Sequence, residues 1–400
     1  MAETALDGLK VLEYCQMISG PYCGKLLADM GAEVIKVEEP QLGDAARKRG
    51  PFLDDVPHPE KSGLFLYLNT NKLGITLNLR TTSGRQIFQR LAEQADILIE
   101  DRPPGEMADL GLDYDSLSAI NPGLIFISIT PYGQTGPYRD YKSYHLNLYH
   151  ATGLSSFVYV PRQAEPDSPP VVAGGQVGDY DGGLTAAVAA LAALWIRLAT
   201  GEGQYIDISK FEALLAMERV EICRFANQPD APPWKGMVGG LVPCQDGHVV
   251  VTPAQNHQWQ ALVKLMGNPA WAQEENCRDE FARAQHRDEI QQRLEEWMAQ
   301  HPKEEIYSEG QRVGLPVGPV RTVAEIANWQ QARQRGFFAP LDHPQAGRLE
   351  YPAAAYKMSE TPWRGERAAP LLGEHNEQVY CCRLGYSREE LARMAAAGII

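Results

Sequence analysis

The side chains best suited to chemistry lie in one glycine-rich run, Gly174-Gly175-Gln176-Val177-Gly178-Asp179-Tyr180-Asp181-Gly182-Gly183. We interpret this run as a turn before a long apolar helix that begins near Leu184. Glycines allow close approach of a substrate to a carboxylate, and the positive end of a helix favours its ionised form. An aspartate placed here can act as a nucleophile. The alternative is that Asp179 or Asp181 only caps the helix, which is a common role for aspartate.

The size and charge of the chain indicate its number of domains and exclude some classes of partner. The 400 residues predict two domains, and 51 acidic against 37 basic residues give a net charge of −14. Such a charge repels nucleic acids and anionic membranes, so we expect neither as a partner. The apolar segment 184–199 is interpreted as a buried helix, and residues 1–4 do not resemble a secretory signal. We expect a cytoplasmic protein.

Cysteines and histidines give no sign of a metal site. The seven cysteines are odd in number and lack metal-ligand spacing, and the nine histidines form no H-E-x-x-H motif. We therefore expect reduced thiols and no protein-held metal.

The elements that must position the carboxylates alternate between strand and helix. Apolar runs predict strands at residues 9–14, 32–38, 74–79, 96–100, 124–130 and 205–208. Helical patterns fall at residues 21–30, 82–95, 185–199 and 210–226. This alternation predicts a doubly wound α/β domain with a parallel sheet.

The pattern changes after residue 226. Prolines and glycines interrupt residues 227–247, and a strand at 248–253 followed by helical segments to residue 311 predicts a smaller domain. Residues 317–320 are expected to return toward the first domain.

Several loops could bind a ligand. The first β-α-β unit lacks the G-x-G-x-x-G that admits a pyrophosphate, which argues against a nicotinamide cofactor. Residues 69–72 (NTNK) and the cations of residues 47–49 could meet phosphates, or those cations could simply be solvated. Tyr144, His145 and His150 follow a loop after an apolar strand, where they could donate hydrogen bonds or move protons, or serve only as structural residues. No G-x-S-x-G elbow supports a serine hydrolase.

Motifs in a fixed order carry a more specific signal. They are residues 6–12 (LDGLKVL), 20–21 (GP), 27–38 (LADMGAEVIKVE), 43–44 (GD), 71–72 (NK), 104–105 (PG), 110–111 (LG), 121–122 (NP), 132–137 (YGQTGP), 201–204 (GEGQ), 246–247 (DG) and 370–375 (PLLGEH). Together they resemble the family III CoA-transferases, which include formyl-CoA transferase, carnitine CoA-transferase and the α-methylacyl-CoA racemases. The resemblance covers nearly the whole chain.

The resemblance implies roles for particular residues. Asp179 matches the family nucleophile, which forms a mixed anhydride with the donor acyl group and then an aspartyl-CoA thioester. The CoA-binding positions it implies are Ile18, Lys72, Lys142 and Tyr144. His145 would face the acceptor acid, and Gly239 and Gly240 belong to a glycine loop, residues 236–240, that closes over the nucleophile. Glu39 and Asp109 stand where formyl-CoA transferase has basic residues, so nucleotide binding is expected to differ in detail.

The resemblance also implies an architecture and partners. It predicts a Rossmann-like large domain (1–226), a smaller α+β domain (227–320) and a C-terminal segment (321–400) that returns to the large one. Two protomers would interlock, with a homodimer expected and a heteromer with a related subunit as the alternative. Acyl-CoA and a free carboxylic acid would be the substrates, with no tightly bound cofactor.

Two other functions remain open on the same fold. Tyr144 stands where the racemases have their histidine, which favours transfer, but a one-residue shift would place His145 there and favour an acyl-CoA racemase or epimerase. The chain could also be a non-catalytic subunit of a heteromeric transferase, although the presence of Asp179 argues against it.

Overall fold

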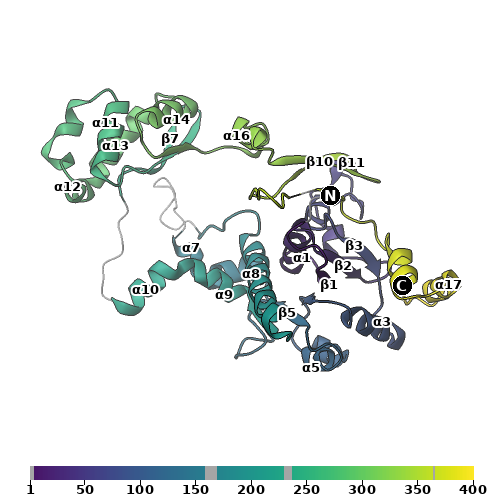
Figure 1. The fold of residues 1–400 in the computed structure, drawn as a ribbon. Helices are drawn as coiled ribbons and strands as arrows, with labels where there is room; N and C mark the ends of the chain where they lie inside the picture. Colours follow the sequence, from purple (N-terminus) through teal and green to yellow (C-terminus); the bar gives the residue numbers. More distant parts are fainter. Residues whose placement is uncertain (1–3, 158–168, 229–236, 364) are drawn as a thin grey trace. The chain divides into compact units, whose positions relative to one another are not determined.

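The computed structural model describes residues 4–157, 169–228, 237–363 and 365–400, which form two compact units. Among these residues, unit 1 contains 4–157, 169–222 and 334–400, and unit 2 contains 223–228 and 237–333 (Figure 1). The units divide at 222/223 and 333/334, whereas the sequence predicted domain boundaries at 226/227 and 320/321.

The centre of unit 1 is a parallel sheet. Within the described residues it has six strands in the order β3-β2-β1-β4-β5-β6, and each pairs in parallel with its neighbours. The strands are β1 Lys10–Tyr14, β2 Glu33–Glu38, β3 Leu73–Thr76, β4 Ile97–Glu100, β5 Ile125–Thr130 and β6 Tyr205–Ser209. The chain reverses its direction of winding between β1 and β4, which is where ligands of such sheets bind. The predicted α/β class is confirmed.

The helices of unit 1 begin at side-chain caps in several places. Thr81, Ser62, Asp113 and Ser209 each accept a hydrogen bond from a backbone N–H of the first turn. The helices are α1 Ser19–Asp29, α2 Gly63–Leu68, α3 Thr82–Ala92, α4 Glu106–Asp109, α5 Tyr114–Ser118, α6 His145–Ala151, α7 Leu154–Phe157, α8 Val177–Thr200, α9 Lys210–Leu215 and α17 Arg388–Ala396. Helix α10 Arg219–Asn227 contains the division at 222/223, so it belongs to both units.

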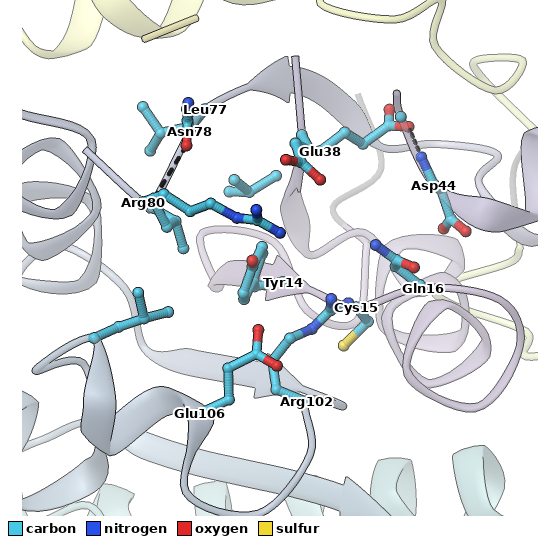
Figure 2. Close-up of a pocket in the computed structure, with 15 residues that line it drawn as sticks. Tyr14, Cys15, Gln16, Glu38, Asp44, Leu77, Asn78, Arg80, Arg102 and Glu106 are labelled. Carbon is cyan, nitrogen blue, oxygen red and sulfur yellow. Dashed lines mark hydrogen bonds between the residues drawn. The ribbon is translucent and has the colours of Figure 1, made fainter. Parts of the chain in front are cut away.

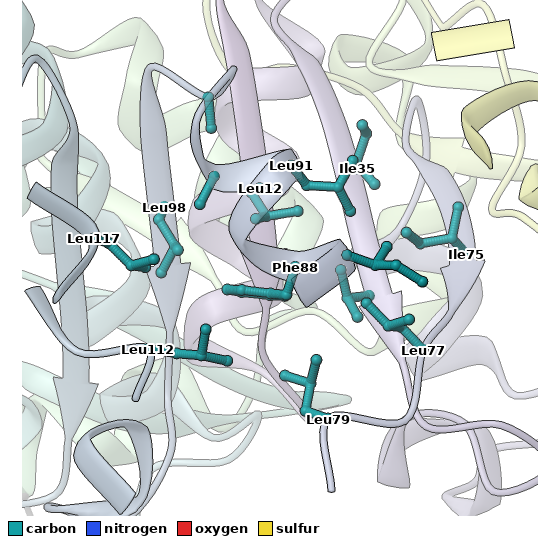
Figure 3. Close-up of a cluster of buried hydrophobic side chains, with 14 of the residues drawn as sticks. Leu12, Ile35, Ile75, Leu77, Leu79, Phe88, Leu91, Leu98, Leu112 and Leu117 are labelled. Carbon is teal, nitrogen blue, oxygen red and sulfur yellow. The ribbon is translucent and has the colours of Figure 1, made fainter. Parts of the chain in front are cut away.

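Apolar cores cover both faces of the sheet, so most residues of strands β2 to β5 are buried. On one face Phe88 and Leu91 of α3 pack against Leu12, Ile35 and neighbouring strand residues (Figure 3). On the other face α1 and α8 pack through small and aliphatic residues, namely Cys23, Leu27, Ala28, Ala186, Ala187, Ala190 and Ala193.

The C-terminal segment lies beside the edge strand β3 (Figure 1). The Tyr380 hydroxyl donates to the carbonyl of Thr76 (2.6 Å), and the Asn376 amide both donates to and accepts from Thr76. His375 Nδ1 accepts from the Gly74 N–H at 3.1 Å. These bonds cover a sheet edge that would otherwise offer unpaired backbone groups. An antiparallel hairpin, β10 Phe338–His343 and β11 Gly347–Pro352, also belongs to unit 1.

Helix α8 corrects two expectations. It begins at Val177 and not near Leu184, so Asp179 lies in its first turn. The expected buried helix is wrong for one face, because Leu184, Val188, Trp195 and Leu198 are 48%, 62%, 75% and 76% exposed. Among the described residues, α8 is also long and apolar enough to cross a bilayer. Helices in the cores of soluble proteins can have the same length and composition.

Unit 2 combines a small antiparallel sheet with helices. Its strands are β7 Gly240–Cys244, β8 Gly247–Val251 and β9 Val317–Pro319, and its helices are α11 Asn256–Leu265, α12 Glu280–Gln285, α13 Arg287–Met298, α14 Lys303–Arg312 and α15 Val323–Ala327, with α16 Gln330–Gln334 at its end. Trp259, Leu262 and Leu294 lie in its core. The expected return of residues 317–320 to the first domain is wrong, because Val317–Pro319 pairs with Val249–Val251.

Candidate active site

Asp179 forms an ion pair at the start of α8. Its Oδ1 lies 2.8 Å from Nζ of Lys210, and the two side chains are 13% and 15% exposed. The left-handed residue Gln176 precedes the helix, so Asp179 is not the cap residue. The capping interpretation is therefore wrong for Asp179, which contacts a cation from the neighbouring helix α9 and is partly open to solvent.

The glycines around Asp179 have two separate roles. An added Cβ at Gly178 would lie 2.6 Å from Leu214, and at Gly183 it would lie 2.4 Å from the carbonyl oxygen of Ser19. These two glycines therefore allow α8 to approach α9 and α1 closely. Gly174 and Gly175 have no heavy atom within 4 Å of such a Cβ, so open space surrounds the chain just before the helix. Only this second pair fits the expected room for a substrate.

Asp181 has a different environment from Asp179. Successive helix residues are about 100° apart, so positions 179 and 181 face nearly opposite directions. Burial raises the pKa of Asp181, and nearby His145 lowers it. Asp181 Oδ2 and both ring nitrogens of His145 are buried without a hydrogen-bond partner in the described part of the chain. The structure thus places His145 next to Asp181.

Lys72 lies inside unit 1 and not on its surface. Its ammonium contacts Glu13 Oε2 (2.7 Å), the Pro21 carbonyl (2.7 Å) and the Asn69 amide oxygen (2.9 Å), and the residue is 0% exposed. Burial lowers its pKa to about 8, although Glu13 opposes that shift. Glu13 also pairs with Lys36 at 2.9 Å. We call Glu13, Lys36, Lys72 and Asp44 the buried ion cluster; Lys72 has no surface that CoA reaches in this structure.

The buried ion cluster holds the loop between β1 and α1. Lys36 pairs with Asp44 (2.8 Å) and donates to the carbonyl of Cys15 (3.0 Å), while Asp44 accepts from the Met17 N–H (2.9 Å). Asp101, after β4, accepts from the Gln16 N–H at 3.0 and 2.9 Å. Met17 has a φ of 62°, which is unfavourable for a side-chain-bearing residue. The cluster thus stabilises a strained loop of the kind that functional sites use.

This loop borders a cavity of about 280 Å³ at the carboxyl ends of β1 to β4. Figure 2 shows Arg80 and Arg102 on either side of Tyr14 in the cavity. The guanidinium of Arg102 lies 4.5 Å from the centre of the Tyr14 ring. The remaining lining residues include Gln16, Glu38, Glu39, Asp44, Asn78 and Glu106. An aromatic ring with two guanidinium groups suits an aromatic, anionic ligand such as a nucleotide.

Two further acids near the cavity have altered pKa values. Burial raises the pKa of Glu100, at the end of β4, to about 7 and that of Asp101 to about 6. Glu100 Oε2 accepts from the Arg102 N–H at 2.6 Å and lines a second cavity beside Tyr114, Phe126 and Tyr205. Among the described residues, no group of three or more His, Cys, Asp or Glu side chains is arranged to hold a metal ion.

The other predicted residues lie in several places. Lys142 and Tyr144 are exposed, Tyr144 at 80%, and Ile18 is buried just before α1. Gly239 and Gly240 have φ values of 97° and 76° at the start of β7, and the Gly239 N–H donates to Gln291 at 2.8 Å. These glycines belong to unit 2. Gly236 of the predicted glycine loop lies outside the described residues.

Some site residues were missed by sequence reasoning. Lys210, Arg80 and Arg102 were not singled out, because one cation after a strand is common on any protein surface. Arg47 was expected to be solvated or to meet phosphates, but it is buried and bonds Glu38 at 2.7 and 2.8 Å. Glu13 and Lys36 did carry a usable signal, since a charge inside an apolar strand needs a partner.

Comparison with known proteins identifies the family. The family model described as CoA-transferase family III matches residues 6–376. The chain is 33% identical to succinate–glutarate CoA-transferase of Agrobacterium fabrum, with 94% of each chain covered. It is 32% identical to formyl-CoA:oxalate CoA-transferase of Streptomyces avermitilis, with 99% of each covered. A crystal structure of a CAIB/BAIF family protein from Brucella suis has a TM-score of 0.83 and 31% identity, covering 94% of this chain and 99% of that one.

The chain therefore belongs to CoA-transferase family III and is a CoA-transferase. The expected family and fold class are confirmed. As a CoA-transferase it acts on CoA thioesters.

Proposed function

We propose that this enzyme transfers CoA from an acyl-CoA donor to a free carboxylic acid through covalent intermediates on Asp179. The observation that carries the proposal is the ion pair of Asp179, which is partly exposed in the first turn of α8, with the ammonium of Lys210. The chain's membership of CoA-transferase family III supports the same function. A helix N-terminus and a lysine both favour the ionised, nucleophilic form of a carboxylate.

The reaction proceeds in four steps. One oxygen of Asp179 attacks the thioester carbon of the donor, the C–S bond breaks, and CoA leaves as a thiolate. The thiolate attacks Cγ of Asp179, releasing the donor acid and leaving an aspartyl-CoA thioester. The acceptor carboxylate attacks the same Cγ and displaces CoA again. Finally the thiolate attacks the acceptor's carbonyl, and the Asp179 carboxylate is regenerated. These steps require no tightly bound cofactor.

The nucleotide of CoA is proposed to bind in the cavity of Arg80, Arg102 and Tyr14. The loop from Cys15 to Ile18 connects this cavity with the N-terminus of α1. At the N-terminus of α1, the backbone of Ser19 lies close to Gly183 of α8. The ring of Tyr22 lies 4.8 Å from the ring of Tyr180, and Tyr180 is the residue that follows Asp179. The loop therefore offers a route for the pantetheine arm from the nucleotide to the nucleophile, and Ile18 would contact that arm through its backbone.

Other predicted residues keep proposed roles. Lys142 and Tyr144 are exposed and available to CoA, and Gly239 and Gly240 keep the assignment to the family's glycine loop that the resemblance implies. His145 would help to orient the acceptor together with its acidic neighbour Asp181. We do not propose Lys72 as a CoA ligand, since its ammonium is bonded inside the protein.

The acceptor is proposed to be a dicarboxylic acid. The two relatives are named for transfer involving succinate, glutarate and oxalate, all of which carry two carboxylates. A panel of mono- and dicarboxylic acids, assayed with one acyl-CoA donor, tests this class: a preference for monocarboxylic acids would contradict it.

Replacing Asp179 by Asn tests the function. We expect the Asp179→Asn variant to lose at least about a thousandfold in CoA transfer, because an amide is a poor nucleophile. Asp181→Asn is the matched control and should keep measurable turnover. Transfer at the wild-type rate by Asp179→Asn would refute the proposed function.

We also propose that a second copy of the chain covers the exposed face of α8. Leu184, Val188, Trp195 and Leu198 repeat at helical spacing and form an apolar stripe, which is unusual on a free surface. Light scattering should give the mass of a dimer, and Trp195→Glu should give a monomer. A monomeric wild type would contradict this. A cytoplasmic location remains proposed, in keeping with the seven free cysteines.

A further inference from the structure

We infer that Lys210 stabilises the negative charge that develops on Asp179 itself when the aspartyl carbonyl is attacked. This inference rests on the proposed function, because it needs covalent intermediates on Asp179. It assigns to Lys210 a catalytic role in two of the four steps.

The electron balance of those steps identifies the oxygen concerned. In the second and third steps the nucleophile attacks Cγ of Asp179, and the electron pair of the C=O bond moves to the side-chain oxygen that does not carry the acyl group. The oxygen is neutral in the anhydride and the thioester, and it becomes an oxyanion in each tetrahedral intermediate. The C=O bond then re-forms as the carboxylate or the thiolate leaves.

The position of Lys210 matches what an oxyanion requires. Its Nζ lies 2.8 Å from Asp179 Oδ1, within the 2.7–3.1 Å that is effective for donors to an oxyanion. If the other oxygen of Asp179 makes the first attack, Oδ1 is the oxygen that later bears the charge. The ammonium is then already in place, so the transition state requires no reorganisation.

The fold fixes the approach of Lys210. The residue is the first of α9, directly after β6, where the Phe211 N–H donates to the Pro131 carbonyl at 2.9 Å. Its aliphatic stem lies over Gly182, where an added Cβ would be 3.0 Å from Lys210 Cγ. Positions 179 and 182 lie on the same face of a helix. Gly182 thereby leaves room for the lysine stem, and the ammonium reaches Asp179 one turn earlier.

The place of Lys210 in α9 also argues against a role that is limited to stabilising this helix. A cation in the first turn of a helix opposes the helix dipole, so Lys210 does not stabilise α9 through its charge. With both side chains only 13–15% exposed, the ammonium is largely shielded from water, which strengthens its effect on a nearby charge.

The test measures a single turnover with acyl-CoA and no acceptor. Rapid quenching and mass spectrometry follow the CoA adduct on Asp179. We expect Lys210→Met to form this adduct about 10²–10³ times more slowly, the usual loss for one oxyanion donor, with the KM for acyl-CoA changed by less than about threefold. Lys210→Arg keeps the charge and should recover to within about tenfold of wild type.

Two further variants separate chemistry from folding. Arg197→Met removes the ion pair with Asp96 (2.6 Å, both side chains 23% exposed) at the other end of α8, and it should form the adduct at the wild-type rate. Gly182→Ala favours the helix but displaces the Lys210 stem, so it should slow adduct formation several-fold without lowering the melting temperature.

The outcomes distinguish the inference from the proposed function. If the wild type forms no adduct on Asp179, the proposed function fails and the inference fails with it. If the wild type forms the adduct and Lys210→Met forms it equally fast, only the inference is overturned. A change confined to the KM for acyl-CoA would also overturn it, because Lys210 would then only bind substrate.

Discussion

Unit 1 contains two lysine–carboxylate sites that differ in exposure. In the buried ion cluster, Lys36, Lys72 and Glu13 are 0% exposed, and each ammonium makes further bonds to protein oxygens. The Asp179–Lys210 pair is 13–15% exposed and lies beside the open space around Gly174 and Gly175. A lysine–carboxylate ion pair therefore fixes a loop at the first site, whereas the pair at the second site is accessible to a substrate.

The difference shows which charges are free to react. A charge buried with several partners cannot change its bonding without a large desolvation cost, so it suits a structural role. A partly exposed pair costs less to separate, and its partner can be acylated during turnover. Exposure together with the number of partners thus distinguishes Lys210 from Lys72, although both were simply lysines after a polar residue in the sequence.

The largest effect on stability should come from the buried ion cluster. Lys72→Met leaves Glu13 Oε2 without its cation, and we expect the free energy of unfolding to fall by about 3–5 kcal/mol. Lys210→Met, at the less buried pair with fewer partners, should lower it by less than Lys72→Met does. Chemical denaturation measures both, and equal losses in the two variants would remove the distinction drawn between the sites.

Glu100 extends the comparison to a buried acid whose pKa is raised. Burial raises the pKa of Glu100 from its ordinary value of 4.5 to about 7 in the folded protein. Between these two pH values the folded state therefore holds a proton that the unfolded state has lost. The free energy of unfolding should therefore fall by up to about 3 kcal/mol as the pH rises from about 4.5 to 7. Glu100→Gln should flatten this dependence, whereas Glu309→Gln, on the surface of unit 2, should not. An unchanged profile in Glu100→Gln would contradict the burial argument.

Arg80 provides the smallest expected effect, at an exposed cation of the cavity. Arg80→Ala should raise the KM for acyl-CoA about tenfold with kcat unchanged, because one cation facing phosphate contributes mainly to binding. The effect should shrink at high salt. Arg312→Ala, an exposed arginine of unit 2, serves as the control. A loss in kcat alone would place Arg80 at the chemistry and not at the nucleotide.

Much of the fold could be predicted from the sequence, because apolar runs and helix caps are local signals. Each predicted strand of the large sheet appears within a few residues, and Asp179 was singled out by its glycine-rich surroundings. The start of α8 was missed, since glycines weaken helix propensity and here serve the close packing of α8 on α1 and α9.

The pairing of side chains could not be predicted in the same way. Lys210 follows Asp179 by 31 residues and meets it only because α8 and α9 lie together. Lys72 resembled a CoA contact, but its ion-pair partner Glu13 comes from β1, far away in the sequence. The exposed face of α8 was also hidden, because composition shows that a helix is apolar but not which face is covered.

Mapping the covalent adduct shows directly whether Asp179 is the nucleophile. Wild-type enzyme is quenched during turnover with acyl-CoA, digested, and the peptide that contains both Asp179 and Asp181 is sequenced by mass spectrometry. We expect CoA linked as a thioester to Asp179, with Asp181 unmodified. An adduct on Asp181 or on any other residue, or turnover without an adduct, would contradict it.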